Sequence, residues 1–204
     1  MDEIKKRGIK VGYTPDVLTE ATAELSVALL LATCRRLPEA MQEVKNGGWK
    51  SWSPMWMCGY GLSNSTVGII GLGRIGLAIA QRLRPFGVKK FLYTGRKPRP
   101  ERASEVDAEY ISCDKLAQES DFVIVSCSLT PETEGLCNKD FFGRMKKTSV
   151  FINISRCVSI ANNFCVTESS EALRIWGIYY IFQTITHILI GNLLPGTSFS
   201  LKTD

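Results

Sequence analysis

Three glycines in one short stretch of the sequence have the spacing of a phosphate-binding turn. The stretch reads Gly71-Leu72-Gly73-Arg74-Ile75-Gly76 and fits the pattern G-x-G-x-x-G. In that pattern the first glycine permits a tight turn, the second lets a pyrophosphate approach the backbone, and the third lets helix and strand pack closely. Free N–H groups at the start of the following helix also attract phosphate. We therefore expect a dinucleotide site here; a turn that serves packing alone is the alternative.

The residues after the second predicted strand indicate which dinucleotide would bind. An NAD site has Asp or Glu about 20 residues beyond the glycines, where it accepts a hydrogen bond from the ribose 2′-hydroxyl. Here the stretch reads Tyr93-Thr94-Gly95-Arg96-Lys97-Pro98-Arg99, without an acid. A hydroxyl and several cations suit a 2′-phosphate, and Arg96 is best placed for a bidentate contact. We expect NADP rather than NAD, bound by Thr94, Gly95, Arg96 and Lys97; a solvated basic turn is the alternative.

Apolar runs on both sides of the glycine turn predict the elements that position it. Buried strands are expected at residues 66–70, 90–94, 109–111, 122–126 and 150–153. Helical segments are expected between them, at residues 74–86, 101–106 and 115–118. Strands that alternate with helices at this spacing predict an α/β fold with a doubly wound parallel sheet of Rossmann type.

The residues before the sheet predict helices and an exposed loop. A long apolar helix is expected over residues 19–37, with Thr19 as its N-cap. Pro38 either kinks this helix or begins a second one that ends near Asn46. A loop rich in tryptophan follows.

The composition excludes several classes of protein. The 204 residues are 45% apolar and 22% charged, which is ordinary for a globular protein and excludes disorder, collagen and coiled coil. A net charge of +5 is too small to indicate a nucleic-acid partner. The seven cysteines form no C-x-x-C pair and the N-terminus has no apolar signal segment. We therefore expect a cytoplasmic protein with reduced thiols and no metal site.

Several segments of the sequence resemble the D-isomer-specific 2-hydroxyacid dehydrogenases. They are the glycine turn, residues 128–133 after the fourth strand, and residues 151–156. Residues 46–62 and 136–142 are similar, more narrowly, to members of that family that reduce glyoxylate and hydroxypyruvate. The resemblance extends over about residues 2–156.

The resemblance implies a flavodoxin-like substrate domain and a Rossmann-type cofactor domain with the active site between them. Residues 1–14 would be a remnant of the substrate domain, and residues 15–156 an incomplete cofactor domain whose last strands are missing. Residues 157–204 would be an unrelated tail. The resemblance also implies a homodimer, in which Trp52 reaches the active site of the neighbouring subunit.

The chemistry implied by the resemblance is hydride transfer from NADPH to a 2-keto acid. An Arg holds the substrate carboxylate, and a His paired with a Glu protonates the new alkoxide. The Arg falls on Arg156, although this residue could simply end a strand. The residues that would line the cofactor after the fourth strand are Cys127, Ser128, Leu129 and Thr130. Thr130-Pro131 is also a possible helix start.

The match to the family ends after Arg156. The family continues with Gly and later has a Pro-His motif, whereas this chain continues Cys157-Val158-Ser159. The only histidine is His187, which has no acid close to it in the sequence. We therefore expect no catalysis from this chain alone. The alternative function is a module that binds NADP(H), or pairs with another subunit, without catalysis.

The last 48 residues differ in composition from the rest. Their charged residues are Glu168, Glu171, Arg174, Lys202 and Asp204. The uncharged run 175–194 is long enough to cross a bilayer, but its polar residues argue against insertion. A membrane span, packing on the exposed edge of the sheet, and poor order are the alternatives for this segment.

Overall fold

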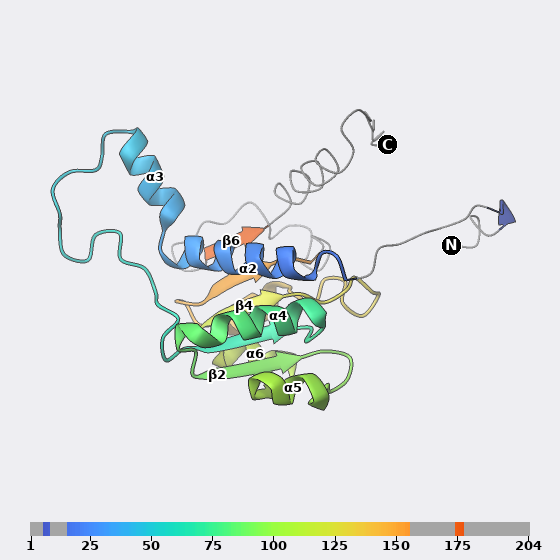
Figure 1. The fold of residues 1–204 in the computed structure, drawn as a ribbon. Helices are drawn as coiled ribbons and strands as arrows, with labels where there is room; N and C mark the ends of the chain where they lie inside the picture. Colours follow the sequence, from blue (N-terminus) through green and yellow to red (C-terminus); the bar gives the residue numbers. More distant parts are fainter. Residues whose placement is uncertain (1–5, 9–15, 156–173, 178–204) are drawn as a thin grey trace.

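In a computed structural model of the chain, the residues described are 6–8, 16–155 and 174–177 (Figure 1). Two helices precede the sheet: α2 (Thr19–Cys34) and α3 (Leu37–Lys45). The sequence Ile9-Lys10-Val11 also predicts a short strand, and these residues lie outside the described part.

Parallel strands form one sheet in the order β3-β2-β1-β4-β5-β6. The strands are β1 (Thr66–Ile70), β2 (Lys90–Thr94), β3 (Ala108–Tyr110), β4 (Phe122–Val125), β5 (Val150–Asn153) and β6 (Arg174–Gly177). From β1 the chain runs outward to β3 and then crosses back to form β4 on the other side of β1. The prediction of a doubly wound parallel sheet is therefore confirmed, and its topological switch point lies between β1 and β4.

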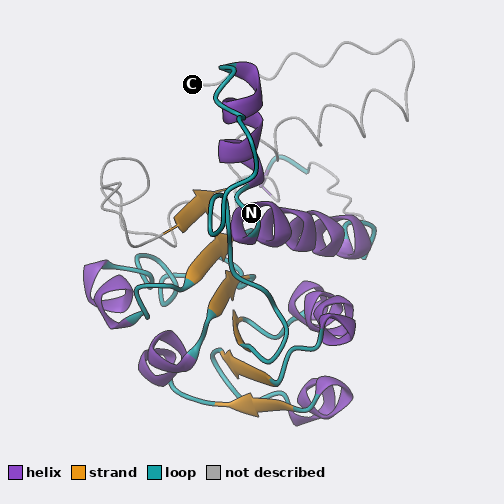
Figure 2. Cartoon of the chain, turned by 90° about the vertical axis from the view of Figure 1, so that its left-hand side faces the viewer, coloured by secondary structure: helices purple, strands orange, loops and turns teal. Residues whose placement is uncertain are grey.

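Helices cover both faces of the sheet (Figure 2). Those that follow β1 are α4 (Arg74–Leu83), the short 3-10 turn η1 (Arg84–Phe86), α5 (Pro100–Val106), α6 (Cys113–Glu119) and α7 (Lys139–Arg144). Helices α2, α4 and α5 pack together on one face, whereas α6 and α7 pack together on the other.

Successive residues of the central strands contribute to two separate cores. In β4, Phe122 and Ile124 belong to the core under α2 and α4, whereas Val123 and Val125 belong to the core under α6 and α7. Because both faces are covered, every residue of this strand is buried. This explains why the strand appears in the sequence as a continuous apolar run.

The start of α2 differs from the expectation. Thr19 is the first helical residue, and the N-cap position is Leu18, which makes no side-chain capping bond. Burial of Ala23 and Leu30 in the core under α2 compensates for the missing cap. Helix α2 ends at Cys34, and Arg36, with a left-handed φ of 55°, is the N-cap of α3, so Pro38 lies in the first turn of a second helix.

The segment after β4 also differs from the expectation. Pro131 opens a turn rather than a helix, in which Thr133 Oγ1 accepts a hydrogen bond from the Thr130 N–H at 2.8 Å. The following helix begins later, at α7, where Asn138 Oδ1 caps the Phe141 N–H at 3.0 Å. Side-chain acceptors therefore decide both the turn and the delayed helix.

Four residues of the compositionally distinct last segment lie in the sheet. Strand β6 pairs in parallel with β5, with Arg174 opposite Val150. The remainder of residues 157–204, including most of the uncharged run, lies outside the described part. Among the described helices none is both long and apolar enough to cross a membrane.

Candidate cofactor site

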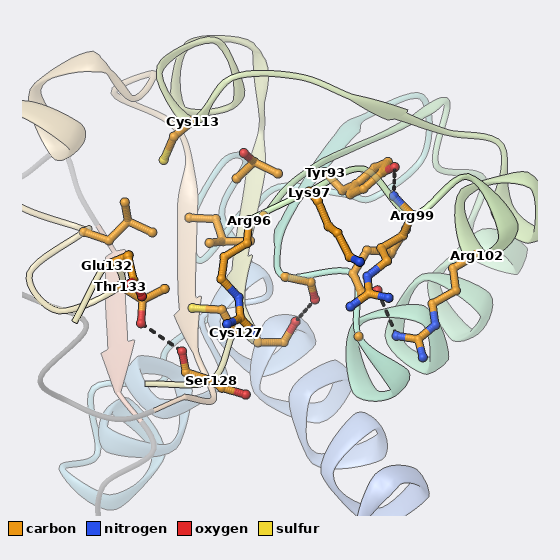
Figure 3. A pocket seen from close by; sticks show the side chains of 18 residues that line it. Tyr93, Arg96, Lys97, Arg99, Arg102, Cys113, Cys127, Ser128, Glu132 and Thr133 are labelled. Atoms are coloured by element: carbon orange, nitrogen blue, oxygen red, sulfur yellow. Dashed lines mark hydrogen bonds between the residues drawn. The ribbon is translucent and has the colours of Figure 1, made fainter. Parts of the chain in front are cut away.

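A cleft of about 770 Å³ lies at the carboxyl ends of β1, β2 and β4 (Figure 3). Its walls are the glycine turn after β1, the basic loop after β2 and the segment after β4. The predicted cofactor residues that line it are Gly71, Leu72, Gly73, Thr94, Gly95, Arg96, Lys97, Cys127 and Ser128. Three segments that are distant in the sequence thus meet at the switch point of the sheet.

Two glycines of the turn are required by close backbone approach. Gly71 has a φ of 99°, its N–H donates to the Thr94 carbonyl at 2.9 Å, and a Cβ there would lie 2.8 Å from the Cys127 backbone. A Cβ at Gly76 would lie 2.4 Å from the Gly71 carbonyl oxygen. The first and third glycines therefore let the strand, the turn and α4 pack against one another.

Gly73, the second glycine, lies beside open space. A Cβ at this position would meet nothing nearer than the Arg102 Nη1 atom at 4.0 Å. Helix α4 begins at the next residue, so its first-turn N–H groups face the same region. The turn therefore fits a pyrophosphate, because the space left by the absent side chain adjoins free amide donors.

The wall that follows β2 is positively charged. Arg96 and Lys97 are exposed, and Arg99 and Arg102 are half-buried. The nearest carboxylate of Arg99 is that of Glu101, at 4.0 Å. Within the described ranges, Arg96, Lys97 and Arg102 have no carboxylate oxygen within 4.0 Å. The charge of this wall is therefore suited to an anionic ligand.

Glu132 contributes a negative charge on the opposite wall. A hydrogen bond from the Thr130 hydroxyl lowers the pKa of this carboxyl below its usual range, and the charge of Arg96 lowers it further. Glu132 is therefore ionised at neutral pH. One carboxylate faces four cations of the lining, so the cleft keeps a positive charge.

Two cysteines, Cys113 and Cys127, add less polar groups to the lining of the cleft. Burial raises the pKa of the Cys113 thiol to about 11, and burial also raises the pKa of Cys127. Both thiols are therefore neutral at physiological pH, which suits contact with a nucleotide base rather than nucleophilic chemistry. In the described part of the chain no cluster of His, Cys, Asp and Glu is suited to hold a metal ion.

Other predicted residues lie away from the cleft. Arg74 forms an ion pair with Asp16, and Ile75 lies in the first turn of α4 behind the glycines. Leu129 is 43% exposed, and Thr130 bonds to Thr133 rather than facing the cleft.

Two residues were singled out for roles beyond cofactor binding, Arg156 for catalysis and Trp52 for pairing with another subunit. Arg156 lies outside the described residues, as does His187. Trp52 is 85% exposed in the loop between α3 and β1.

Some lining residues were missed by the sequence reasoning. Tyr93 lies within a predicted strand, yet its hydroxyl accepts a hydrogen bond from the Arg99 N–H at 2.9 Å and so shapes the basic loop. Arg102 lies on α5 and reaches back to the turn, where Nη1 donates to the Leu72 carbonyl at 3.2 Å. The sequence shows that Arg102 follows the basic run Arg96–Arg99 closely. It does not show that the packing of α5 brings the Arg102 side chain to the cleft.

A glycine turn at the switch point of a doubly wound parallel sheet, facing a cationic loop, defines a dinucleotide-binding domain of Rossmann type. The sequence model of one family, described as "D-isomer specific 2-hydroxyacid dehydrogenase, NAD binding domain", matches residues 27–167. The chain belongs to this family.

Relatives and solved structures agree with this assignment. The chain is 74% identical over 156 residues to the glyoxylate reductase/hydroxypyruvate reductase of Homo sapiens, which covers 76% of this chain and 48% of the human protein. It is 46% identical over 160 residues to a glyoxylate reductase of Thermococcus kodakarensis, and the match covers 76% of this chain and 48% of that protein. The TT0316 protein of Thermus thermophilus superposes with a TM-score of 0.72 at 38% identity, covering 78% of this chain and 49% of that structure. The chain thus spans about half the length of these proteins.

Substitution of Gly76 should affect mainly stability, whereas substitution of Gly73 should affect mainly dinucleotide binding. Gly76→Ala should lower the free energy of unfolding by about 1–3 kcal/mol, because its Cβ would overlap a fixed backbone oxygen. Gly73→Ala should change stability by about 1 kcal/mol or less but weaken dinucleotide binding about tenfold, because its methyl occupies the ligand's space. Urea unfolding and cofactor titration of both variants measure this. Equal loss of stability in the two would contradict the distinction.

The raised thiol pKa predicts a pH dependence of alkylation. Below about pH 11 Cys113 is protonated, so its rate of reaction with iodoacetamide should rise about tenfold per pH unit between about pH 7 and 10. Peptide mass mapping measures this rate, with the exposed Cys58 as the internal reference that reacts first. Fast, pH-independent labelling of Cys113 would show that the thiol is not held neutral by burial.

Proposed function

We propose that the cleft binds NADP(H), and that this chain supplies the cofactor-binding part of a reductase that transfers hydride to glyoxylate or hydroxypyruvate. The observation that carries the proposal is the charge of the loop after β2. Where an NAD-binding domain has an acid for the ribose 2′-hydroxyl, this loop offers Arg96 and Lys97 to the same cleft as the glycine turn. Cations without a carboxylate partner favour a 2′-phosphate over a hydroxyl.

The binding geometry follows from the residues of the turn. Gly73 leaves the space beside the first turn of α4 open, so amide donors would hold the pyrophosphate. Ser128 and Cys127, beyond β4, would line the nicotinamide half, and the neutral Cys113 would lie near the adenine. Bound NADPH supplies the hydride; the described residues orient the cofactor and hold its charge.

The substrate assignment rests on the relatives and on the end of β5. The human relative is named a glyoxylate reductase/hydroxypyruvate reductase, and we extend that activity to the whole protein. Ser155 Oγ donates to the Cys127 carbonyl at 2.5 Å, which ties the chain just before Arg156 to the wall of the cleft. By the family resemblance, Arg156 would hold the carboxylate of a 2-keto acid. The cytoplasmic location expected from the sequence belongs to the same proposal.

We also infer that the 204 residues alone bind cofactor without turning over substrate. A reduced carbonyl needs a proton donor, and the one histidine, His187, has no acid near it in the sequence. The chain would then act as a binding module rather than as a complete catalyst.

Cofactor titration and an activity assay test this function together. The purified chain should bind NADPH at least about tenfold more tightly than NADH, because a 2′-phosphate adds charge-assisted hydrogen bonds. It should not oxidise NADPH when hydroxypyruvate is added. Lys97→Gln should weaken NADPH about tenfold and leave NADH unchanged, with Lys147→Gln, an exposed lysine that does not line the cleft, as the control. Tighter binding of NADH would contradict the NADP assignment, and robust turnover would contradict the inactivity.

A second candidate function, pairing with another copy of the chain, is favoured by the surface of α3. Leu37, Met41 and Val44 lie along one side of this helix and are 50%, 58% and 63% exposed. The helix projects from the body of the domain, and none of its residues is buried (Figure 1). Trp52, in the loop that follows α3, is also exposed. An apolar face of this length on a projecting helix fits a self-complementary dimer.

The pairing is tested by charge placed on that face. Met41→Glu should weaken the dimer about tenfold or more, because a carboxylate would be buried at the interface. Gln42→Glu adds the same charge on an adjacent part of the helix and should have a smaller effect. Light scattering after size-exclusion chromatography measures the association. A wild-type chain that is monomeric at all concentrations, or equal effects of the two substitutions, would rule out pairing through this face.

A further inference from the structure

We propose that Arg102 selects NADPH over NADH by binding the adenosine 2′-phosphate, an inference that rests on the proposed NADP(H) site. Arg102 lies on α5, outside the basic run that follows β2. Its guanidinium nevertheless reaches the cleft, where Nη1 donates to the Leu72 carbonyl at 3.2 Å.

The position of Arg102 is fixed by its helix. Its neighbour Ala103 and, one turn later, Val106 are buried in the core, and the N–H groups of Arg102 and Ala103 both donate to the Arg99 carbonyl, at 3.1 and 2.9 Å. The side chain is half-buried and bonded at its tip. A cation held in this way loses little conformational freedom when an anion binds.

The guanidinium has unused donors at the cleft. One of its five N–H groups is directed at the Leu72 carbonyl, and a planar fork remains for a second acceptor. Other cations of this domain already have carboxylate partners: Arg82 pairs with Glu20 and Lys146 with Asp121. No carboxylate within the described residues lies within 4.0 Å of Arg102. A half-buried guanidinium that faces a cleft with free N–H donors and no nearby carboxylate is suited to bind a phosphate.

The side of the cleft indicates which phosphate Arg102 binds. Lys97 and Arg99 point toward the same side of the cleft as Arg102, whereas Arg96 points toward Cys127 (Figure 3). That side is formed by the loop after β2, where a dinucleotide-binding domain receives the adenosine ribose. The pyrophosphate faces the start of α4, and Arg102 Nη1 borders that region from the side of the loop, 4.0 Å from a Cβ built on Gly73. Arg102 therefore adds a second element, α5, to the recognition of the 2′-phosphate.

Two nucleotides that differ only in the 2′-phosphate test the proposal. Isothermal titration of the full chain with 2′,5′-ADP should show about tenfold or greater loss of affinity in Arg102→Gln, and 5′-AMP affinity should be unchanged. Arg102→Lys keeps the charge but lacks the planar fork of donors, so its affinity for 2′,5′-ADP should lie between those of the wild type and Arg102→Gln. NADPH and NADH titrations should show the same contrast.

Arg84→Gln is the matched control. Arg84 Nη1 also donates to a backbone carbonyl, that of Glu105 at 3.3 Å, but it does not line the cleft. This variant should bind all four nucleotides like the wild type. Thermal unfolding of each variant shows whether the fold is retained.

The outcomes separate this inference from the proposed function. Unchanged 2′,5′-ADP affinity in a folded Arg102→Gln variant would overturn the role of Arg102 alone. Equal losses for 2′,5′-ADP and 5′-AMP would also overturn it, because they would indicate support of the turn or contact with the 5′-phosphate. A wild-type chain that binds neither NADPH nor 2′,5′-ADP would instead contradict the proposed function.

Discussion

Close backbone packing at the switch point is the constraint on which the site depends. The Gly71 carbonyl accepts a hydrogen bond from Ser126 Oγ at 2.8 Å, and the absent side chain of Gly76 lets α4 lie against the same oxygen. Gly71 also lies against the Cys127 backbone, so the end of β1 and the end of β4 are in direct contact. Any side chain at these two positions would separate the strands and the helix. The cleft exists because this contact brings three loops to one edge of the sheet.

The charge of the cleft depends on the same packing. Arg96 and Lys97, after β2, have no carboxylate oxygen within 4.0 Å among the described residues, whereas Arg99 has Glu101 at 4.0 Å. Cations on the outer surface, such as Lys90 beside Glu109, form ion pairs. Exposed ion pairs contribute little to stability. Cations gathered at a cleft make the electrostatic potential there more positive, which favours a negatively charged ligand. Glu132 reduces this potential from the facing wall without reversing it.

The sequence predicted the sheet well because its central strands are buried on both sides. Residues 66–70 and 90–94 were expected as strands with the bounds that β1 and β2 have, since continuous apolar runs leave little choice of position. Elements governed by short polar contacts were harder to predict. The turn at Pro131 depends on the hydrogen bond from the Thr130 N–H to Thr133 Oγ1, and the cap at Asn138 on the bond that it accepts from the Phe141 N–H. Thr19 has the residue type of an N-cap, but the burial of α2 fixed where that helix begins.

The class of fold, the glycine turn and the basic character of the loop after β2 can all be inferred from the amino-acid sequence. These features are local, because each depends on residue types and spacing within one segment. Which cations reach the cleft cannot be inferred in this way, because it depends on how the helices pack across the sheet. Arg74, inside the glycine motif, turns away to Asp16, whereas Arg102, far outside it, reaches back to the Leu72 carbonyl. Distance along the chain does not encode such contacts; the packing of α5 against the core does.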